Sequence, residues 1–126
     1  SPDAFMTEFY VLGREGRAES YPRDARVGER LTVTMGIRNL ERTTHTYKVL
    51  VYAIDVWEDR QEPMALAGPF TLAREEGVEE VVAWAMPWAG QDQTVEFHLS
   101  SDAQEAGADE PYRLLRLWMD VEEPEG

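Results

Sequence analysis

The chain has 126 residues, of which 43% are hydrophobic and 10% aromatic; it has no cysteine, and its formal charge is 12 minus 25, or −13. This length and composition are typical of one globular domain, and the lack of cysteine excludes disulfides, thiolate metal sites and cysteine nucleophiles. The negative charge repels phosphate backbones and anionic lipid headgroups, so we expect no binding to nucleic acid or to a membrane surface.

We expect residues 1–126 to form a single domain with flexible ends at residues 1–4 and 122–126. No apolar run approaches the ~20 residues that a membrane-spanning helix needs. The first three residues, Ser-Pro-Asp, do not begin a signal peptide. We therefore interpret the chain as a piece excised from a larger protein.

The N-terminal part predicts two strands and a turn. Residues 5–12 carry aromatic and aliphatic side chains on both faces, which indicates a strand. The spacing of Gly13 and Gly16 predicts a tight turn, because glycine adopts positive φ without a Cβ clash. Residues 17–21 then form a short return strand. Pro22 ends it, because proline cannot donate to a ladder, and this indicates an edge position.

The next segments predict three longer strands. In residues 31–38 every second residue is a large apolar one, which indicates a half-buried antiparallel strand. Residues 47–56 are apolar on both faces, so we expect a central strand covered on one side by the facing sheet and on the other by loops. Residues 58–63 predict a charged turn, and residues 65–72 predict an edge strand kinked at Gly68-Pro69.

The C-terminal part predicts three more strands, at residues 78–86, 94–100 and 112–121, with a loop at residues 102–110. In the closing strand the outward side chains are those of Tyr112, Arg116, Trp118 and Asp120. The whole pattern gives seven to eight strands and no substantial helix. It is typical of an antiparallel, immunoglobulin-like β-sandwich, with a small barrel as the alternative.

Segments at both ends of the chain resemble one protein family. The sequence TEFYVLG at residues 7–13 resembles the start of the soluble C-terminal region of the uncharacterised prokaryotic membrane-protein family known as domain of unknown function 1616. The segments that resemble later parts of that region are residues 16–22, 27–29, 36–39 and 111–118. The resemblance implies an extracytoplasmic domain, attached to the membrane through upstream helices, and it brings no catalytic residues or assigned activity.

The residues offer little chemistry for catalysis. His45 and His98 are the two histidines, and a zinc site needs three or four converging ligands. Ser100 and Ser101 lie near His98 in the sequence, but they lack the Gly-x-Ser-x-Gly elbow of a hydrolase. A pair of glycosidase carboxylates needs a cleft that a small sandwich rarely forms. We predict that the protein is no enzyme and has no cofactor.

The acidic residues provide weak candidates for calcium. Asp55, Glu58 and Asp59 share one predicted turn, and a second acidic group lies in residues 102–110. Calcium sites use six to eight oxygens, with carboxylates closely spaced around a glycine turn, and neither group has that pattern. A chain with this charge forms acidic clusters without any metal, so we predict no metal site.

The tryptophans provide the clearest candidates for binding. The chain has four tryptophans, a high number for its length: Trp57, Trp84, Trp88 and Trp118. Each either fills the core or is exposed at the rim of the core. Exposed aromatic rings stack on sugars or contact proteins. We take Trp84, Tyr112 and Trp118 as candidate contact residues.

These observations predict a non-catalytic interaction or scaffolding domain on the extracytoplasmic side of the membrane. Its partner is expected to be another protein or a second copy, bound through an aromatic-rimmed sheet face or a strand edge. The alternative is a carbohydrate-binding module that uses the same aromatic residues, with or without calcium.

Overall fold

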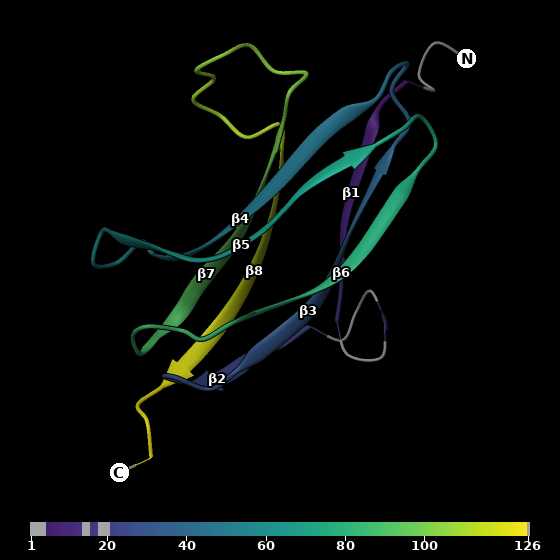
Figure 1. Ribbon diagram of the computed structural model, residues 1–126. Helices are drawn as coiled ribbons and strands as arrows, with labels where there is room; N and C mark the ends of the chain where they lie inside the picture. The colour runs from purple at the N-terminus through teal and green to yellow at the C-terminus, as the bar shows by residue number, and fades with distance from the viewer. Residues whose placement is uncertain (1–4, 14–15, 18–20, 126) are drawn as a thin grey trace.

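The computed structural model describes residues 5–13, 16–17 and 21–125. In these residues eight strands form two sheets, and no α-helix is present (Figure 1). The strands are β1 (Thr7–Leu12), β2 (Asp24–Arg26), β3 (Leu31–Asn39), β4 (His45–Asp55), β5 (Arg60–Leu72), β6 (Gly77–Trp84), β7 (Gly90–Ser101) and β8 (Arg113–Glu122). No helix in the described part of the chain has the length and apolarity to span a membrane.

The sheets have the orders β1-β3-β6 and β2-β8-β7-β4-β5. Every strand pair is antiparallel except β2 with β8. β1 and β2 follow each other in the chain but lie in different sheets, and β4 lies between β5 and β7. The predicted all-β, immunoglobulin-like sandwich is confirmed, including the central position of the fourth strand.

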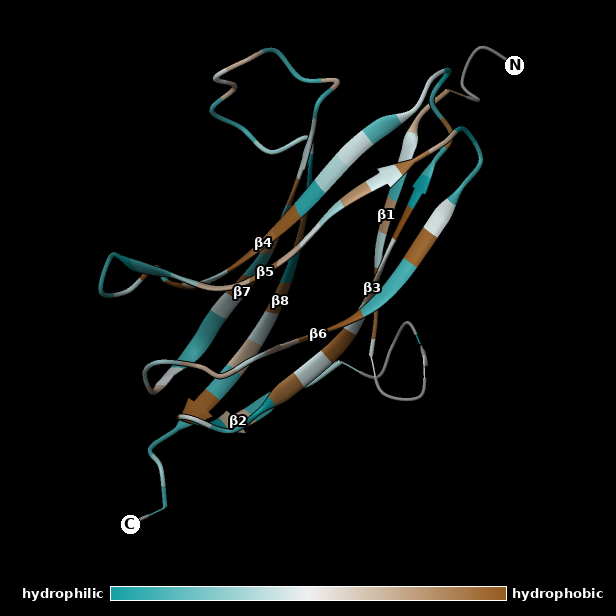
Figure 2. Cartoon of the chain, viewed as in Figure 1, coloured by the Kyte–Doolittle hydropathy of each residue, from teal (hydrophilic) through white to brown (hydrophobic). Residues whose placement is uncertain are grey.

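The core lies between the two sheets and is built by alternation. Along β3 apolar residues alternate with more polar ones, and the hydropathy colouring of the strand alternates with them (Figure 2). In β8 the buried residues Leu117, Met119 and Val121 alternate with exposed ones. The fully buried apolar residues of the central strands are Met35, Ile37, Val49, Val51, Ala53, Val95, Phe97 and Leu99. The period of two that predicted these strands therefore also places the core.

Several local predictions need correction. The three-residue strand β2 was not predicted, and β8 extends to Glu122, into the expected flexible tail. The outer face of β4 is not covered by loops, since Leu50 is 38% exposed. The predicted strand at residues 17–21 lies largely outside the described residues. Of the predicted glycine turn before it, residues 14–15 lie outside the described residues; Gly16 has a φ of 70° and its N–H donates to the carbonyl of Gly13.

Candidate functional site

The outward face of the five-stranded sheet carries side chains in rows, because the register across β5, β4, β7 and β8 is fixed. The first row contains Leu66, Leu50, His98 and Leu114. The second contains Tyr52, Glu96 and Arg116, and the third contains Gln61, Ile54, Thr94 and Trp118. We call these three rows, with the adjoining pair Lys48 and Ser100, the five-stranded face.

Large apolar side chains are exposed on this face. Leu66 is 61% exposed, Trp118 is 59% exposed, and Leu50 is 38% exposed. They come from β5, β8 and β4, so they span the width of the sheet rather than one strand. Three apolar side chains are thus exposed on the outward side of one sheet, among polar neighbours.

A polar cluster lies at the centre of the five-stranded face. Arg116 Nε donates to Glu96 Oε2 over 2.6 Å, and His98 Nε2 donates to Glu96 Oε1 over 2.8 Å. The ring of Tyr52 lies 4.7 Å from the His98 ring. Partial burial alone raises the pKa of Glu96, but the bonds from His98 and Arg116 outweigh it and hold that pKa below its usual value.

The charge of the five-stranded face differs from that of the whole chain. Its charged residues are Lys48, Arg116 and Glu96, which gives two positive charges minus one, or +1, against −13 for the chain. The next charged side chain along the outward side of β8 is the exposed Asp120, two residues beyond Trp118, so this side of the sheet carries little net charge.

The three candidate contact residues have different surroundings. Trp118 is exposed on the five-stranded face, as expected for a contact residue. The assignment of Trp84 is wrong, because its indole is 4% exposed and packs edge-to-face on Phe97, with ring centroids 5.8 Å apart. Trp84 pairs with Leu31 in the sheet and points into the core with it. Tyr112 lies at the other end of β8 and is half-buried.

The hydroxyl of Tyr112 belongs to a hydrogen-bond network at one end of the sandwich. It donates to Glu41 Oε2 over 2.6 Å, and Thr7 Oγ1 donates to the same oxygen over 2.8 Å. The hydroxyl of buried Tyr47 lies 2.8 Å from Thr7 Oγ1 and donates to it, because the proton of Thr7 is already used. Tyr112 therefore has a structural role here rather than that of an exposed aromatic platform.

Glu41 is the acceptor at the centre of this network. Burial raises the pKa of Glu41, but the hydrogen bonds from Tyr112 and Thr7 outweigh burial and lower it. These bonds join β1, the β3–β4 turn and the loop before β8. The network ties together segments that are far apart in the sequence, and its donors and acceptors are satisfied within the protein.

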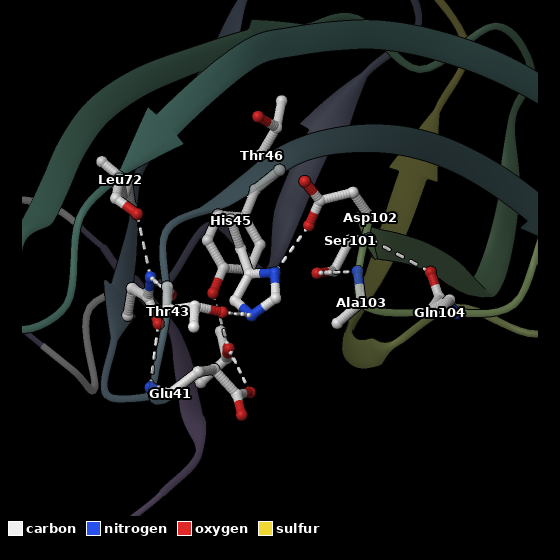
Figure 3. Close-up of polar contacts among 12 residues, drawn as sticks. Glu41, Thr43, His45, Thr46, Leu72, Ser101, Asp102, Ala103 and Gln104 are labelled. Atoms are coloured by element: carbon white, nitrogen blue, oxygen red, sulfur yellow. Dashed lines mark hydrogen bonds and ion pairs between the residues drawn. The ribbon is translucent and has the colours of Figure 1, made fainter.

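A hydroxyl, a histidine and a carboxylate line up beside this network (Figure 3). His45 Nδ1 lies 2.7 Å from Asp102 Oδ1, and His45 Nε2 lies 3.2 Å from Thr43 Oγ1. The order resembles that of a catalytic triad, which also needs free donors for an oxyanion. The nearby main-chain amides are engaged: Asp102 N donates to Thr46 O, and Ala103 N donates to Ser101 Oγ. The arrangement is therefore a link that holds the β7–β8 loop against the start of β4.

The calcium candidates Asp55, Glu58 and Asp59 lie where β4 turns into β5. Asp55 is 3% exposed, and its Oδ1 accepts from the backbone N–H groups of Trp57 and Glu58. Its Oδ2 accepts from Arg60 over 3.1 Å. Burial raises the pKa of Asp55, but these bonds and one from Gln93 lower it. Among the described residues, no three His, Cys, Asp or Glu side chains are grouped to hold a metal ion.

The model of one protein family, described as Domain of unknown function (DUF1616), matches residues 2–120. The chain belongs to this family. The match covers nearly the whole sequence, including residues 58–90, where the sequence alone had shown no resemblance. No curated protein sequence matches the DUF1616 chain.

Solved structures similar to this DUF1616 domain share its fold at low sequence identity. The CARDB domain of the PF1109 protein from Pyrococcus furiosus, in complex with di-metal ions, has a TM-score of 0.54 and 13% identity, covering 96% of this chain and 97% of that one. A β-glucosidase from Listeria innocua, in complex with glucose, has a TM-score of 0.62 and 15% identity, covering 94% and 16%. Spo0M, a sporulation control protein from Bacillus subtilis, has a TM-score of 0.57 and 11% identity, covering 92% and 49%. The DUF1616 domain therefore has a CARDB-like, immunoglobulin-like fold.

Sequence reasoning about the DUF1616 domain missed part of the five-stranded face. Leu50 and Leu66 were assigned to strands but not to a binding surface. Loops were expected to cover Leu50, and Leu66 was expected to lie in an ordinary edge strand. A signal for Leu50 was present, since residues 47–56 are apolar on both faces and only one face can pack on the opposite sheet. Glu96 and Arg116 pair across strands, which sequence spacing alone does not reveal.

Proposed function

We propose that this DUF1616 domain is a non-catalytic protein-interaction domain, and that it binds its partner through the five-stranded face. The observation that carries the proposal is the joint exposure of Leu50, Leu66 and Trp118 on one sheet surface. Leu50 and Leu66 pair directly across β4 and β5, while Trp118 lies on β8, beyond the pair of Glu96 and Arg116. Exposed apolar side chains on one surface of a folded domain mark sites of association, and tryptophan is among the residues that contribute most binding energy. Burying them against a partner removes this apolar area from water.

Two of the four edge strands, β6 and β5, carry features that oppose pairing, which favours the face over these edges as the contact. Glu80 of β6 pairs with Met35, whose side chain is fully buried, so Glu80 points toward the core side of an edge strand and is exposed there. An inward-pointing charge prevents another strand from docking at such an edge. β5, an edge strand of the other sheet, contains Pro63, which cannot donate to a ladder, and its pairing with β4 has two register shifts.

The carbohydrate-binding alternative has less support. A sugar platform uses aromatic rings that stand together, whereas Trp84 is buried and Tyr112 is half-buried at the far end of β8 from Trp118. The oxygens of Asp55 already accept bonds within its own turn, so they do not favour calcium. The glucose and the di-metal ions of the similar structures belong to those proteins.

We further propose that the domain stands on the extracytoplasmic side of the cell membrane and serves as a scaffold there. The membership in the DUF1616 family supports this location, since the family resemblance implies membrane-spanning helices elsewhere in a longer protein. A protease added outside spheroplasts should cut the domain while the membrane is intact. Cutting that requires lysis would contradict the location and leave the interaction proposal standing.

Photo-crosslinking in the native cell tests the interaction. A photo-activatable residue replaces Leu66 of the full-length protein, and the control replaces Val81, which is 63% exposed on β6 in the other sheet. We expect a discrete protein adduct from position 66 and none of that size from position 81. Equal adducts at both positions, or none at position 66, would refute the five-stranded face as the contact.

A further inference from the structure

We propose that an extended segment of a different protein adds as a further strand along the free edge of β8, beside Trp118. We call residues 114–118 of β8, on the side that faces away from β7, the β8 edge. This inference deepens the proposed function and rests on it, because β8 borders the five-stranded face and carries its exposed tryptophan. It states how the partner binds: through main-chain hydrogen bonds as well as side-chain contacts.

β8 is paired only in part on the side that faces β2. β8 runs from Arg113 to Glu122, whereas its parallel pairing with β2 begins at Asp120. On the opposite side, β7 pairs with β8 from Arg113 to Val121. Among the described residues, no strand pairs with residues 113–119 on the β2 side. The larger part of β8 is therefore an edge of the five-stranded sheet.

Hydrogen bonds at the β2 end show which main-chain groups of β8 face this side. The N–H of Asp120 donates to the carbonyl of Arg23, and the carbonyl of Glu122 accepts from the N–H of Val27. Consecutive residues of a strand present their N–H and C=O groups to opposite sides of the strand. The even-numbered residues of β8 therefore face the β2 side, and the odd-numbered residues face β7.

The same alternation continues along the rest of β8. The register shift between β7 and β8 places its extra residue in β7, because residues 90–93 lie opposite residues 119–121. The N–H and C=O groups of Leu114, Arg116 and Trp118 therefore point to the free side, and none of them is paired there with a described residue. A row of unpaired main-chain groups is a template for another strand.

The β8 edge lacks the features that oppose pairing at other edges. β5 contains Pro63 and β6 has the inward-pointing Glu80, whereas residues 114–118 contain no proline, no glycine and no inward-pointing charge. The inward side chains are those of Leu115 and Leu117. β2 already pairs on this side of β8, so the structure itself shows that a strand fits there.

The neighbouring side chains define the chemistry of the incoming strand. Leu115 is partly buried and packs against the core, and so does Phe9 of β1, the edge strand of the facing sheet that contacts β8. An apolar side chain on the inner side of the new strand is buried there. On the outer side, a residue opposite Trp118 lies about 5 Å away and covers its indole. The segment that fits is extended, with apolar residues at every second position.

A second copy of this chain fits the β8 edge poorly. Two copies that paired residues 114–118 in full and antiparallel would place Arg116 opposite Arg116, and like charges directly opposite destabilise a sheet. Each copy also has a net charge of −13, so two copies repel each other on approach. These observations favour a segment of another protein without an excess of acidic residues.

Amide hydrogen exchange of the isolated 126-residue chain, followed by NMR, tests whether the edge is free. The N–H groups of Leu114, Arg116 and Trp118 should exchange fast. Those of Leu115 and Leu117, which face β7, should exchange about 100-fold more slowly or less. Equally slow exchange in both sets would show that the edge is closed and would overturn the inference.

A display library of random peptides of about 12 residues supplies the incoming strand. Peptides selected on the isolated chain should slow the exchange of the Leu114, Arg116 and Trp118 amides about tenfold or more. A library from which no peptide is retained, or peptides that protect other amides instead, would contradict strand addition at β8.

Trp118→Pro and Trp118→Ala form a matched pair of variants. Both remove the indole, but only proline also removes the N–H at the free edge. Proline is tolerated there because that N–H has no partner in the sheet. The selected peptides should bind Trp118→Pro about tenfold more weakly than Trp118→Ala, and equal affinity would exclude main-chain pairing. If circular dichroism shows that Trp118→Pro is unfolded, the exchange of the wild-type amides with peptide decides alone.

The outcomes separate this inference from the proposed function. If position 66 gives a discrete adduct in the cell while no peptide protects the β8 amides, the five-stranded face stands and this inference falls. If peptides protect these amides while position 66 gives no adduct, the β8 edge stands as the contact and the rest of the face falls. Exchange that slows with protein concentration alone would identify a second copy as the occupant and overturn the inference.

Discussion

Arg116 Nε and Glu96 Oε2 are joined by a hydrogen bond of 2.6 Å between residues that pair directly across β7 and β8. This bond and the one from His98 keep the pKa of Glu96 lower in the folded protein than in the unfolded chain. A lowered pKa in the folded state gives stability that is present above the unfolded value of about 4.5 and is lost as the pH falls through the folded value.

Glu96→Gln should therefore destabilise the domain by about 1 to 2 kcal/mol at neutral pH, since it removes the charged acceptor of two bonds. The difference in unfolding free energy between wild type and Glu96→Gln should shrink as the pH is lowered below about 4.5. Urea unfolding at a series of pH values measures both quantities. A difference that does not change with pH would show that the charge of Glu96 contributes nothing to folding.

Replacement of Gly36 should disturb the ring of Tyr10. Tyr10 and Gly36 pair across β1 and β3, and a Cβ added to Gly36 would overlap the Tyr10 ring. The Tyr10 hydroxyl donates to Glu79 over 2.6 Å, and this hydrogen bond, followed by burial, raises the pKa of Tyr10 to about 12. We expect Gly36→Ala to cost about 1 to 3 kcal/mol and to return that pKa toward its usual value of 10.0.

Alkaline titration of the tyrosine absorbance in wild type and Gly36→Ala checks this expectation. In the wild type the Tyr10 bond stabilises the fold below about pH 10 and is lost as the pH rises toward about 12. Tyr10→Phe serves as the control, because it removes the titrating group and leaves Gly36 and its neighbours in place. An unchanged titration in Gly36→Ala would mean that the hydrogen bond of Tyr10 does not depend on a glycine at position 36.

His45 is expected to be structural, even though it lies between Thr43 and Asp102. His45→Gln should raise the rate of amide hydrogen exchange in the loop of residues 102–110 and lower stability by about 1 kcal/mol. Hydrolysis of an activated ester should be the same in wild type and His45→Gln. An esterase activity that disappears in both His45→Gln and Thr43→Val would reverse this interpretation.

Asp55 should stabilise the β4–β5 hairpin without calcium. Its carboxylate accepts from two backbone N–H groups and from Arg60, so Asp55→Ala leaves these donors without their acceptor. We expect a loss of about 2 to 3 kcal/mol in the free energy of unfolding. The melting temperature of the wild type should not change when calcium or a chelator is added. A clear rise with calcium would restore the acidic turn as a metal site.

Alternation in the sequence was enough to predict most strands and the sandwich. In β3 and β7 every second residue is buried, so the hydrophobic pattern and the core coincide. β2 was not predicted, because three residues cannot show a period and its partner, β8, lies near the other end of the sequence. In the strand predicted at residues 78–86, Trp84 lies two residues after Val82 and therefore on the same face. Because that face packs into the core, the spacing indicates that Trp84 is buried.

The candidate site was harder to predict from the sequence than the fold. Trp118 was placed outward correctly, because its neighbours Leu117 and Met119 are the buried ones. The role of Tyr112 depends on Glu41, which is 71 residues away in the chain. Leu50 and Leu66 become one surface only through the pairing of β4 with β5. Pairing between distant segments, rather than local pattern, decides which exposed residues lie together.

Cysteine labelling in the native cell tests the interaction face most directly, because the chain has no cysteine of its own. Leu66→Cys and Val81→Cys introduce single thiols at sites of similar exposure, 61% and 63%, on different sheets. In the dilute isolated domain a maleimide should label both at similar rates. In the full-length protein in its own membrane, we predict strong protection of L66C and free labelling of V81C. Equal labelling of the two variants in the cell would contradict binding through the five-stranded face.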